Sequence, residues 1–245
     1  MLIKVKVFSH SKKRGIIKKD KLLINMISFN QVKKNPEVLE FIKQSDESLI
    51  AAGYTEHSLS HAKIVAARAR IIAQEIGFSK QEQEIASIAG FCHDMGNFLS
   101  RSHHHYFGAL LFHQIFNQDF APEELAIIMN AISNHDKDEM NFSNVIAATL
   151  VLADKTDVRR SRVVNKKPKK IKEDIHDRVN FATKISRVRI NKKKKLITLI
   201  LKIDTNFVPI IEYFEIFTDR MVYCRKAAKF LGYKFGLIIN NFKLL

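Results

Sequence analysis

Apolar residues recur at helical spacing through the first two thirds of the chain. Pro36 is followed by apolar positions three and four residues apart as far as Ile50, which predicts a helix that begins at Pro36. A second apolar stripe runs from Ile64 to Ile76 and stops at Gly77, a residue type that commonly ends helices. These patterns predict the first two helices of a bundle.

The next segments continue the helical pattern. Ser79 and Glu82 have the spacing of a capping box and predict the start of another helix. Three further helices are predicted, from about residue 104 to 116, from Pro122 to near residue 134, and from a cap at Ser143 to Asp154.

The period changes in the last quarter of the chain. Residues 185–190 alternate between apolar and polar, residues 191–195 resemble a turn, and residues 196–203 form a second apolar run, so an antiparallel hairpin is predicted. A long amphipathic helix from residue 208 to 231 and a third strand over 235–239 follow. The predicted fold is mainly α, a helical bundle followed by a small C-terminal α+β appendage. We divide the chain into a basic tail (1–25), a helical domain (26–157), a basic connecting segment (158–180) and the appendage (181–245).

The long helix of the appendage has an apolar stripe of its own. The stripe comprises Val208, Ile211, Phe214, Phe217 and Met221. We expect the small sheet to cover it, although the bundle or a second copy of the chain could do so instead. A homo-oligomer is therefore left open.

Composition excludes several classes of protein. The chain has 245 residues, of which 46% are hydrophobic and 27% charged, as in ordinary globular domains. No apolar run reaches the roughly 20 residues needed to span a bilayer, and no apolar stretch of a secretory signal follows the basic start. Two cysteines, Cys92 and Cys224, are too few for a disulfide framework, so we expect a cytoplasmic protein with no membrane partner.

The net charge of +16 is unevenly distributed. Residues 1–25 carry +7 and residues 158–195 carry +13, so the remainder is net negative at −4. A dedicated nucleic-acid binder would show a broader basic surface. Residues 1–25 have two open explanations, a mobile tail or a start codon assigned too early.

The candidate chemistry lies at the ends of the predicted helices. Six histidine and aspartate residues are distributed one or two per helix end: His61, His93, Asp94, His104, His135 and Asp154. Imidazole and carboxylate groups suit divalent ions such as Fe, Mn, Co and Zn, and facing helices of a bundle can bring such groups together. The sequence therefore predicts a metal site in the bundle.

This order of residues resembles the HD-domain superfamily of metal-dependent phosphohydrolases. The resemblance covers about residues 55–157 and rests on five elements in order: His61, then His93-Asp94-Met95-Gly96, then His104 with Gly108, then Asn134-His135-Asp136, then Asp154-Lys155. A second His-Asp pair, His176-Asp177, has no apolar helix before it and is interpreted as structural.

The resemblance implies a ligand set and an activity. The presence of both His104 and His135 implies the two-metal variant, in which Asp94 bridges two divalent ions (Fe, Mn, Mg, Co or Zn). His61, His93 and Asp154 would complete one site, and His104 and His135 the other. The implied reaction is hydrolysis of a phosphate ester or anhydride of a small anionic molecule, most plausibly a nucleotide.

The residues that would contact the substrate are less sharply indicated. The resemblance places Lys155 near the substrate phosphate, and Arg101 and Arg159 are further candidates for phosphate contacts. Family members often carry Lys after the His-Asp-x-Gly element, where this chain has Asn97, and Arg101 could substitute.

Several alternatives stay open. His103 and His105 flank His104, and His57 precedes His61 by one helical turn, so each is an alternative ligand. A different class of function also remains, in which the bundle is a nucleotide sensor and the basic run from Arg159 to Lys172 binds nucleic acid. That run contains no aromatic residue for base stacking, which disfavours nucleic-acid binding.

Overall fold

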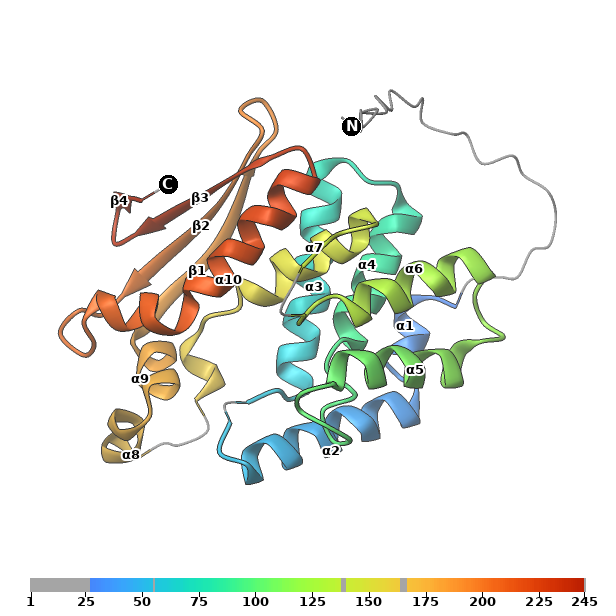
Figure 1. Ribbon diagram of the computed structural model, residues 1–245, viewed down its shortest axis with the longest axis horizontal. Coiled ribbons are helices and arrows are strands. Elements are labelled where there is room, and N and C mark those ends of the chain that lie inside the picture. The colour runs from blue at the N-terminus through green and yellow to red at the C-terminus, as the bar shows by residue number, and fades with distance from the viewer. Residues whose placement is uncertain (1–26, 55, 138–139, 164–166, 245) are drawn as a thin grey trace, which may run out of the picture.

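A computed structural model of the chain describes residues 27–54, 56–137, 140–163 and 167–244. The basic tail predicted over residues 1–25 lies outside the described residues. Helices form the first part of the chain and a four-stranded sheet with one long helix forms the last part (Figure 1). No helix in the described ranges is long and apolar enough to cross a membrane.

The elements follow one another in this order: α1 (Phe29–Val32), α2 (Pro36–Ala51), α3 (Leu59–Ile76), α4 (Lys80–Cys92), α5 (His104–Phe116), α6 (Pro122–Ser133), α7 (Val145–Lys155), the 3-10 helix η1 (Arg160–Arg162), α8 (Pro168–Glu173), α9 (Ile175–Ala182), β1 (Thr183–Asn191), β2 (Leu196–Ile203), α10 (Ile210–Phe230), β3 (Lys234–Ile239) and β4 (Phe242–Lys243).

Helices α3, α4, α6 and α7 pack together and form the core of the bundle. The close approach of α3 to α4 depends on a small residue, because a Cβ atom added to Gly90 would lie 3.0 Å from the Cα of Ala66. Apolar side chains of these helices, including Val65, Ile88 and Ile128, are completely buried. The polar residues at the helix ends are thereby fixed on a rigid apolar scaffold.

The local signals in the sequence act as expected at most helix ends. Asn35 caps α2 at Pro36, Gly77 ends α3 with a φ of 101°, and the side chains of Ser79 and Glu82 form the capping box of α4. The cap of α7 differs by one residue from the prediction. Asn144, not Ser143, is the N-cap, because its side-chain oxygen accepts a hydrogen bond from the Ala147 N–H at 2.8 Å.

The predicted connecting segment is largely folded. It contains η1, α8 and α9, and the side chains of Ile171 and Val179 are buried. Helix α9 contacts both η1 and α10. These short helices were not predicted because charged residues dominate the segment and leave only a few apolar positions to form a pattern.

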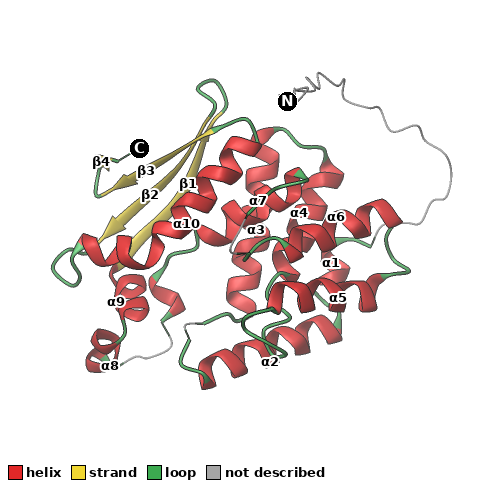
Figure 2. Ribbon diagram, viewed as in Figure 1, coloured by secondary structure: helices red, strands yellow, loops and turns green. Residues whose placement is uncertain are grey.

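The C-terminal sheet has the strand order β1-β2-β3-β4 (Figure 2). Strands β1 and β2 form the predicted antiparallel hairpin, β3 runs parallel to β2 after the α10 crossover, and the short strand β4 was not predicted. Helix α10 contacts α7 of the bundle as well as β3. The appendage therefore joins the bundle through α10.

The buried face of α10 agrees with the predicted stripe in part. Val208, Phe217 and Met221 of the stripe are buried, whereas Ile211 is 62% exposed. Tyr213 and Cys224, which lie outside the stripe, are also buried, because α10 is covered from two sides, by α7 and by the sheet.

Candidate metal centre

All six predicted ligands lie together at one end of the bundle core. They come from the first turn of α3 (His61), the residues after α4 (His93 and Asp94), the start of α5 (His104), the segment after α6 (His135) and the last turn of α7 (Asp154). Each of the six side chains is at most 8% exposed as a residue. Five separate segments therefore converge on one small buried space.

The four imidazole rings are held in the same way, each by its Nδ1 atom. Nδ1 of His93 lies 2.9 Å from the Gly90 carbonyl oxygen, Nδ1 of His104 lies 2.7 Å from that of Arg101, and Nδ1 of His135 lies 2.7 Å from that of Ile132. Since a carbonyl oxygen only accepts, each Nδ1 carries the hydrogen in this arrangement. The Nε2 atoms of the neutral rings then present lone pairs to the centre.

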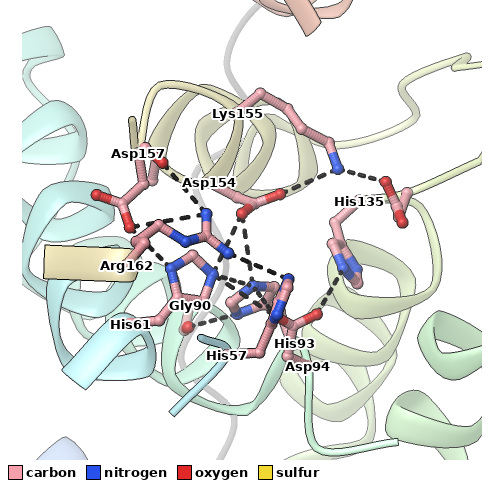
Figure 3. A network of polar contacts seen from close by, with 12 residues as sticks. His57, His61, Gly90, His93, Asp94, His135, Asp154, Lys155, Asp157 and Arg162 are labelled. Carbon is pink, nitrogen blue, oxygen red and sulfur yellow. Dashed lines mark hydrogen bonds and ion pairs between the residues drawn. The ribbon is translucent and has the colours of Figure 1, made fainter. Parts of the chain in front are cut away.

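The His61 ring is also held through its Nδ1 atom, but the hydrogen-bond acceptor is a carboxylate and not a backbone carbonyl. Its Nδ1 donates to Oδ2 of Asp157 at 2.8 Å, and Asp157 is completely buried (Figure 3). A carboxylate behind a histidine fixes the tautomer of the ring and raises its basicity as a metal ligand. Asp157 was not predicted from the sequence as part of the site, although it follows Asp154 by three residues and lies just after the end of α7.

One group of ligand atoms surrounds a common centre. Nε2 of His61 lies 3.3 Å from Nε2 of His93, 3.5 Å from Oδ2 of Asp94 and 3.4 Å from Oδ1 of Asp154. Nε2 of His93 lies 3.2 Å from Oδ2 of Asp94 and 3.7 Å from Oδ1 of Asp154. Two ligand atoms about 2.1 Å from one metal ion are themselves separated by roughly 3.0–3.5 Å, so these distances suit one divalent ion.

The second group uses the other oxygen of Asp94. Its Oδ1 lies 3.4 Å from Nε2 of His104 and 3.5 Å from Nε2 of His135, and the two Nε2 atoms are 3.1 Å apart. Oδ2 of Asp136 lies 3.6 Å from Nε2 of His104, at the edge of this group. Asp94 therefore has one oxygen directed to each group, the arrangement that a bridging ligand requires.

The chemistry of these atoms fits a metal centre. Lone pairs of two imidazoles at 3.1 Å repel each other unless a proton or a cation lies between them. Two neutral histidines and a carboxylate oxygen in each group provide the ligand types preferred by borderline divalent ions.

The aspartates of the centre are ionised. Burial alone would raise the pKa of Asp94, but its contacts with the imidazoles of His93, His104 and His135 hold it well below its usual value. Burial likewise would raise the pKa of Asp154, but the ammonium group of Lys155 and the contact with the His61 imidazole outweigh that effect, and the pKa lies well below its usual value. Both carboxylates are therefore negatively charged at neutral pH and can bind cations.

Lys155 lies at the edge of the centre. Its Nζ is 3.0 Å from Oδ2 of Asp154 and also forms an ion pair with Oδ1 of Asp136. Burial alone would lower the pKa of Lys155, but the two carboxylates outweigh this effect and raise the pKa above its ordinary value. The side chain therefore carries a positive charge. An ammonium group beside the ligand cluster is placed as the sequence predicts, although its contact with a substrate stays a prediction.

The arginines that follow Asp154 are mostly used inside the protein. Arg159 forms an ion pair with Asp157, with its Nε 3.2 Å from both carboxylate oxygens, and Arg68 approaches the same carboxylate to 3.5 Å. Arg162 is 3% exposed and donates to the backbone oxygen of Asp157. Arg159 is therefore paired with the Asp157 carboxylate, which orients the His61 ring, and does not point to the ligand atoms.

The remaining candidates occupy the margin of the site. Arg101 lies beside His104, with its Nη1 3.1 Å from Nδ1 of that ring, and 3.5 Å from Asp136. Asn97 donates to the Asp94 side chain at 3.1 Å, so it holds a ligand in place. His105 is buried next to the centre, but it does not join either group of ligand atoms.

His57 is also close to the ligands without belonging to them. Its ring is 5.7 Å from that of His61, and its Nε2 accepts a hydrogen bond from Arg162 at 3.1 Å. The second His-Asp pair, His176-Asp177, lies on α9 and outside the ligand groups.

Comparison with known proteins agrees with this geometry. Residues 58–179 match the family model of the HD domain. The chain is also 25% identical over 157 residues to the uncharacterized protein MJ1020 of Methanocaldococcus jannaschii, an alignment that covers 55% of this chain and 60% of the relative. The chain thus spans about 60% of the length of the relative it matches. Residues 58–179, with their buried cluster of histidines and aspartates, are therefore an HD domain.

Proposed function

We propose that the protein hydrolyses a phosphate ester or anhydride of a small molecule, with nucleotides as the substrate class, at a centre of two divalent ions. The observation that carries this proposal is the convergence of four Nε2 atoms on the two oxygens of Asp94. Divalent ions at such a centre lower the pKa of a coordinated water and neutralise charge on phosphoryl oxygens.

The residues of the chain have separate parts in this proposal. Asp94 holds the two groups of ligands at a fixed separation, because each of its oxygens faces a different pair of histidines. Lys155 supplies a positive charge to a phosphoryl oxygen as negative charge develops there. Arg101, which is 37% exposed at its side chain, is accessible to an anion that approaches the centre.

The proposal is tested by reconstituting the purified protein separately with Mn²⁺, Fe²⁺, Co²⁺, Zn²⁺ and Mg²⁺. Hydrolysis is then measured with p-nitrophenyl phosphate and a panel of nucleotides. We expect His104→Ala to lower both the metal content and the turnover, the latter by at least about 100-fold. His113→Ala is the matched control, since His113 is an exposed histidine on the same helix. A protein that binds these ions but hydrolyses none of the panel contradicts the proposal.

A further inference from the structure

A small cavity adjoins the metal centre on the side of the appendage. It has a volume of about 210 Å³ and is lined by residues from the α2–α3 connection (Tyr54 and His57), the segment before α5 (Arg101), the start of α9 (Asp174 and His176) and α10 (Arg220). Two of its lining side chains touch the ligand cluster itself. The ring of His57 packs against that of His61, and Arg101 lies beside His104.

Arg220 is the most informative residue of this cavity. Its guanidinium lies over the ring of Phe217, 4.7 Å from the centroid, and the residue is only partly exposed. Within the part of the chain that the structure describes, the guanidinium has no hydrogen bond or ion pair. An arginine that is largely withdrawn from solvent is normally paired, because an unpaired charge in a poorly hydrated place is costly.

The surroundings of Arg220 make this lack of a counterion more significant. Burial lowers its pKa and the cations Arg162 and Arg101 lower it further, whereas Asp154 and Asp136, the carboxylates that raise it, are already engaged by Lys155. The fold therefore holds an arginine near other positive charges, and none of the ion pairs between the described residues includes Arg220. An anionic ligand would stabilise this arrangement.

The other lining groups are compatible with an anion. Burial lowers the pKa of His57 and of His176, so both rings are neutral at pH 7. The carboxylate of Asp174 accepts the backbone N–H of Asp177 at 2.8 Å and caps α9. The cavity thus has two arginines against one carboxylate that is already used as a helix cap.

The size of the cavity limits what it can hold. Pockets for complete drug-sized ligands have volumes of about 300–1,000 Å³, so a cavity of about 210 Å³ suits one group of a ligand better than a whole nucleoside. Its position beside the metal centre allows the rest of the same ligand to reach the ions.

We propose that this cavity, the Arg220 pocket, binds a second phosphate group of the substrate whose first phosphate is hydrolysed at the metal centre. Arg220 and Arg101 would hold this group through charge-assisted hydrogen bonds. The inference rests on the proposed function and narrows it, since the preferred substrate becomes a small molecule with two separate phosphate groups. It also gives the appendage a part in specificity, because Arg220 belongs to α10.

The test compares two probes that differ by one phosphate, adenosine 5′-monophosphate and adenosine 3′,5′-bisphosphate. Their dissociation constants for the metal-loaded protein are measured by calorimetry, and kcat/KM is measured wherever hydrolysis occurs. We expect the bisphosphate to bind at least about tenfold more tightly, the factor that corresponds to one charge-assisted hydrogen bond. Arg220→Gln should remove this preference, and Arg220→Lys should restore part of it.

Two controls separate a binding role from a structural one. Arg225→Gln changes an exposed arginine of the same helix and should leave both dissociation constants unchanged. Arg220→Met keeps an apolar stem over Phe217, so it should fold normally and still lose the preference for the bisphosphate. The inference is overturned if the Arg220 variants weaken the binding of both probes equally. It is also overturned if the wild-type protein binds both probes with equal affinity.

The outcomes also distinguish the inference from the proposed function. Hydrolysis of p-nitrophenyl phosphate without an Arg220-dependent preference would overturn the Arg220 pocket and support the phosphohydrolase. An Arg220-dependent preference without hydrolysis of any probe would support the pocket and contradict the phosphohydrolase.

Discussion

At the scale of single residues, the site depends on groups that orient the ligands as much as on the ligands. Each of the four histidines uses Nδ1 to hold its ring, and only His61 uses a side-chain carboxylate, that of Asp157, for this purpose. Burial alone would raise the pKa of Asp157, but the hydrogen bond from His61 and the charges of Arg162 and Arg68 hold it below its ordinary value. An ionised carboxylate therefore stands behind His61.

Asp157→Asn should weaken metal binding by about 10–100-fold, because the amide removes the negative charge that polarises His61. The dissociation constant is measured by titration of the metal-free variant with Zn²⁺ or Mn²⁺. Asp219→Asn, at an exposed aspartate of α10, is the control that changes net charge equally. Unchanged affinity in Asp157→Asn would mean that the Asp157 carboxylate is not needed to orient His61.

Lys155→Ala should lower kcat for p-nitrophenyl phosphate by about 100-fold while the metal content stays the same, since the ammonium group binds no ion itself. Metal content is measured by elemental analysis of the same samples used for kinetics. Lys137→Ala is the control, because Lys137 directly follows Asp136 in the chain but its ammonium group packs over the ring of Tyr106. Wild-type turnover in Lys155→Ala would remove this residue from the mechanism.

At the scale of elements, the site requires a close contact between the segment after α4 and the start of α5. A Cβ atom added to Gly96 would lie 2.2 Å from the backbone oxygen of His104 and 2.5 Å from the backbone nitrogen of Gly108. Neither atom can move without displacing α5. The glycine therefore allows His93 and His104, which belong to different groups of ligands, to share Asp94.

Gly96→Ala should push α5 away and reduce the metal content, with a loss of stability of about 1–3 kcal/mol. Gly108→Ala should be milder, because its nearest atom would lie at 3.2 Å. Thermal unfolding and elemental analysis of both variants test this order. A Gly96→Ala protein with full metal content would show that α5 can shift without loss of the second group of ligands.

The sequence predicted those elements whose signals are local. The capping box at Ser79 and the helix end at Gly77 depend on a few neighbouring residues, and the ligands could be recognised because they stand at helix ends in a fixed order. Asp136, Asp157 and Arg220 could not be assigned in the same way. Their partners come from other segments, and only the packing of α7 against α3 and α10 brings them to the site.

The packing of α10 against α7 can itself be tested through a thiol. Cys224 on α10 is completely buried, and burial raises the pKa of this thiol to about 12. A thiol-specific reagent at pH 8 should therefore label neither Cys224 nor the buried Cys92 in the native protein, and should label both after unfolding. Fast labelling of one thiol in the native Cys92→Ala variant would show that α10 separates readily from the bundle.

At the scale of the whole molecule, the basic composition has more than one structural use. Arg159 and Arg162 surround the buried Asp157, and Arg101 and Arg220 line the cavity beside the metal centre. Lysines 192–195, by contrast, lie exposed in the turn between β1 and β2. The positive charge near the ligands thus balances internal carboxylates or lines the cavity that we propose for an anionic substrate.

Metal binding should also couple the parts of the molecule, because the ligands belong to α3, α5, α7 and the segments after α4 and α6. Without a cation, the carboxylate oxygens of Asp94 and Asp154 that face the centre lie against the Nε2 atoms of the histidines. A ligand present at 100 times its dissociation constant stabilises the native state by about 2.7 kcal/mol, which raises the melting temperature of a chain of this size by about 5–10 °C. Removal of metal with a chelator should lower the melting temperature by that amount, and readdition of Mn²⁺ or Zn²⁺ should restore it. Asp94→Asn should melt at one temperature with or without metal, whereas an equal response of the wild type and this variant would show that the ions act elsewhere.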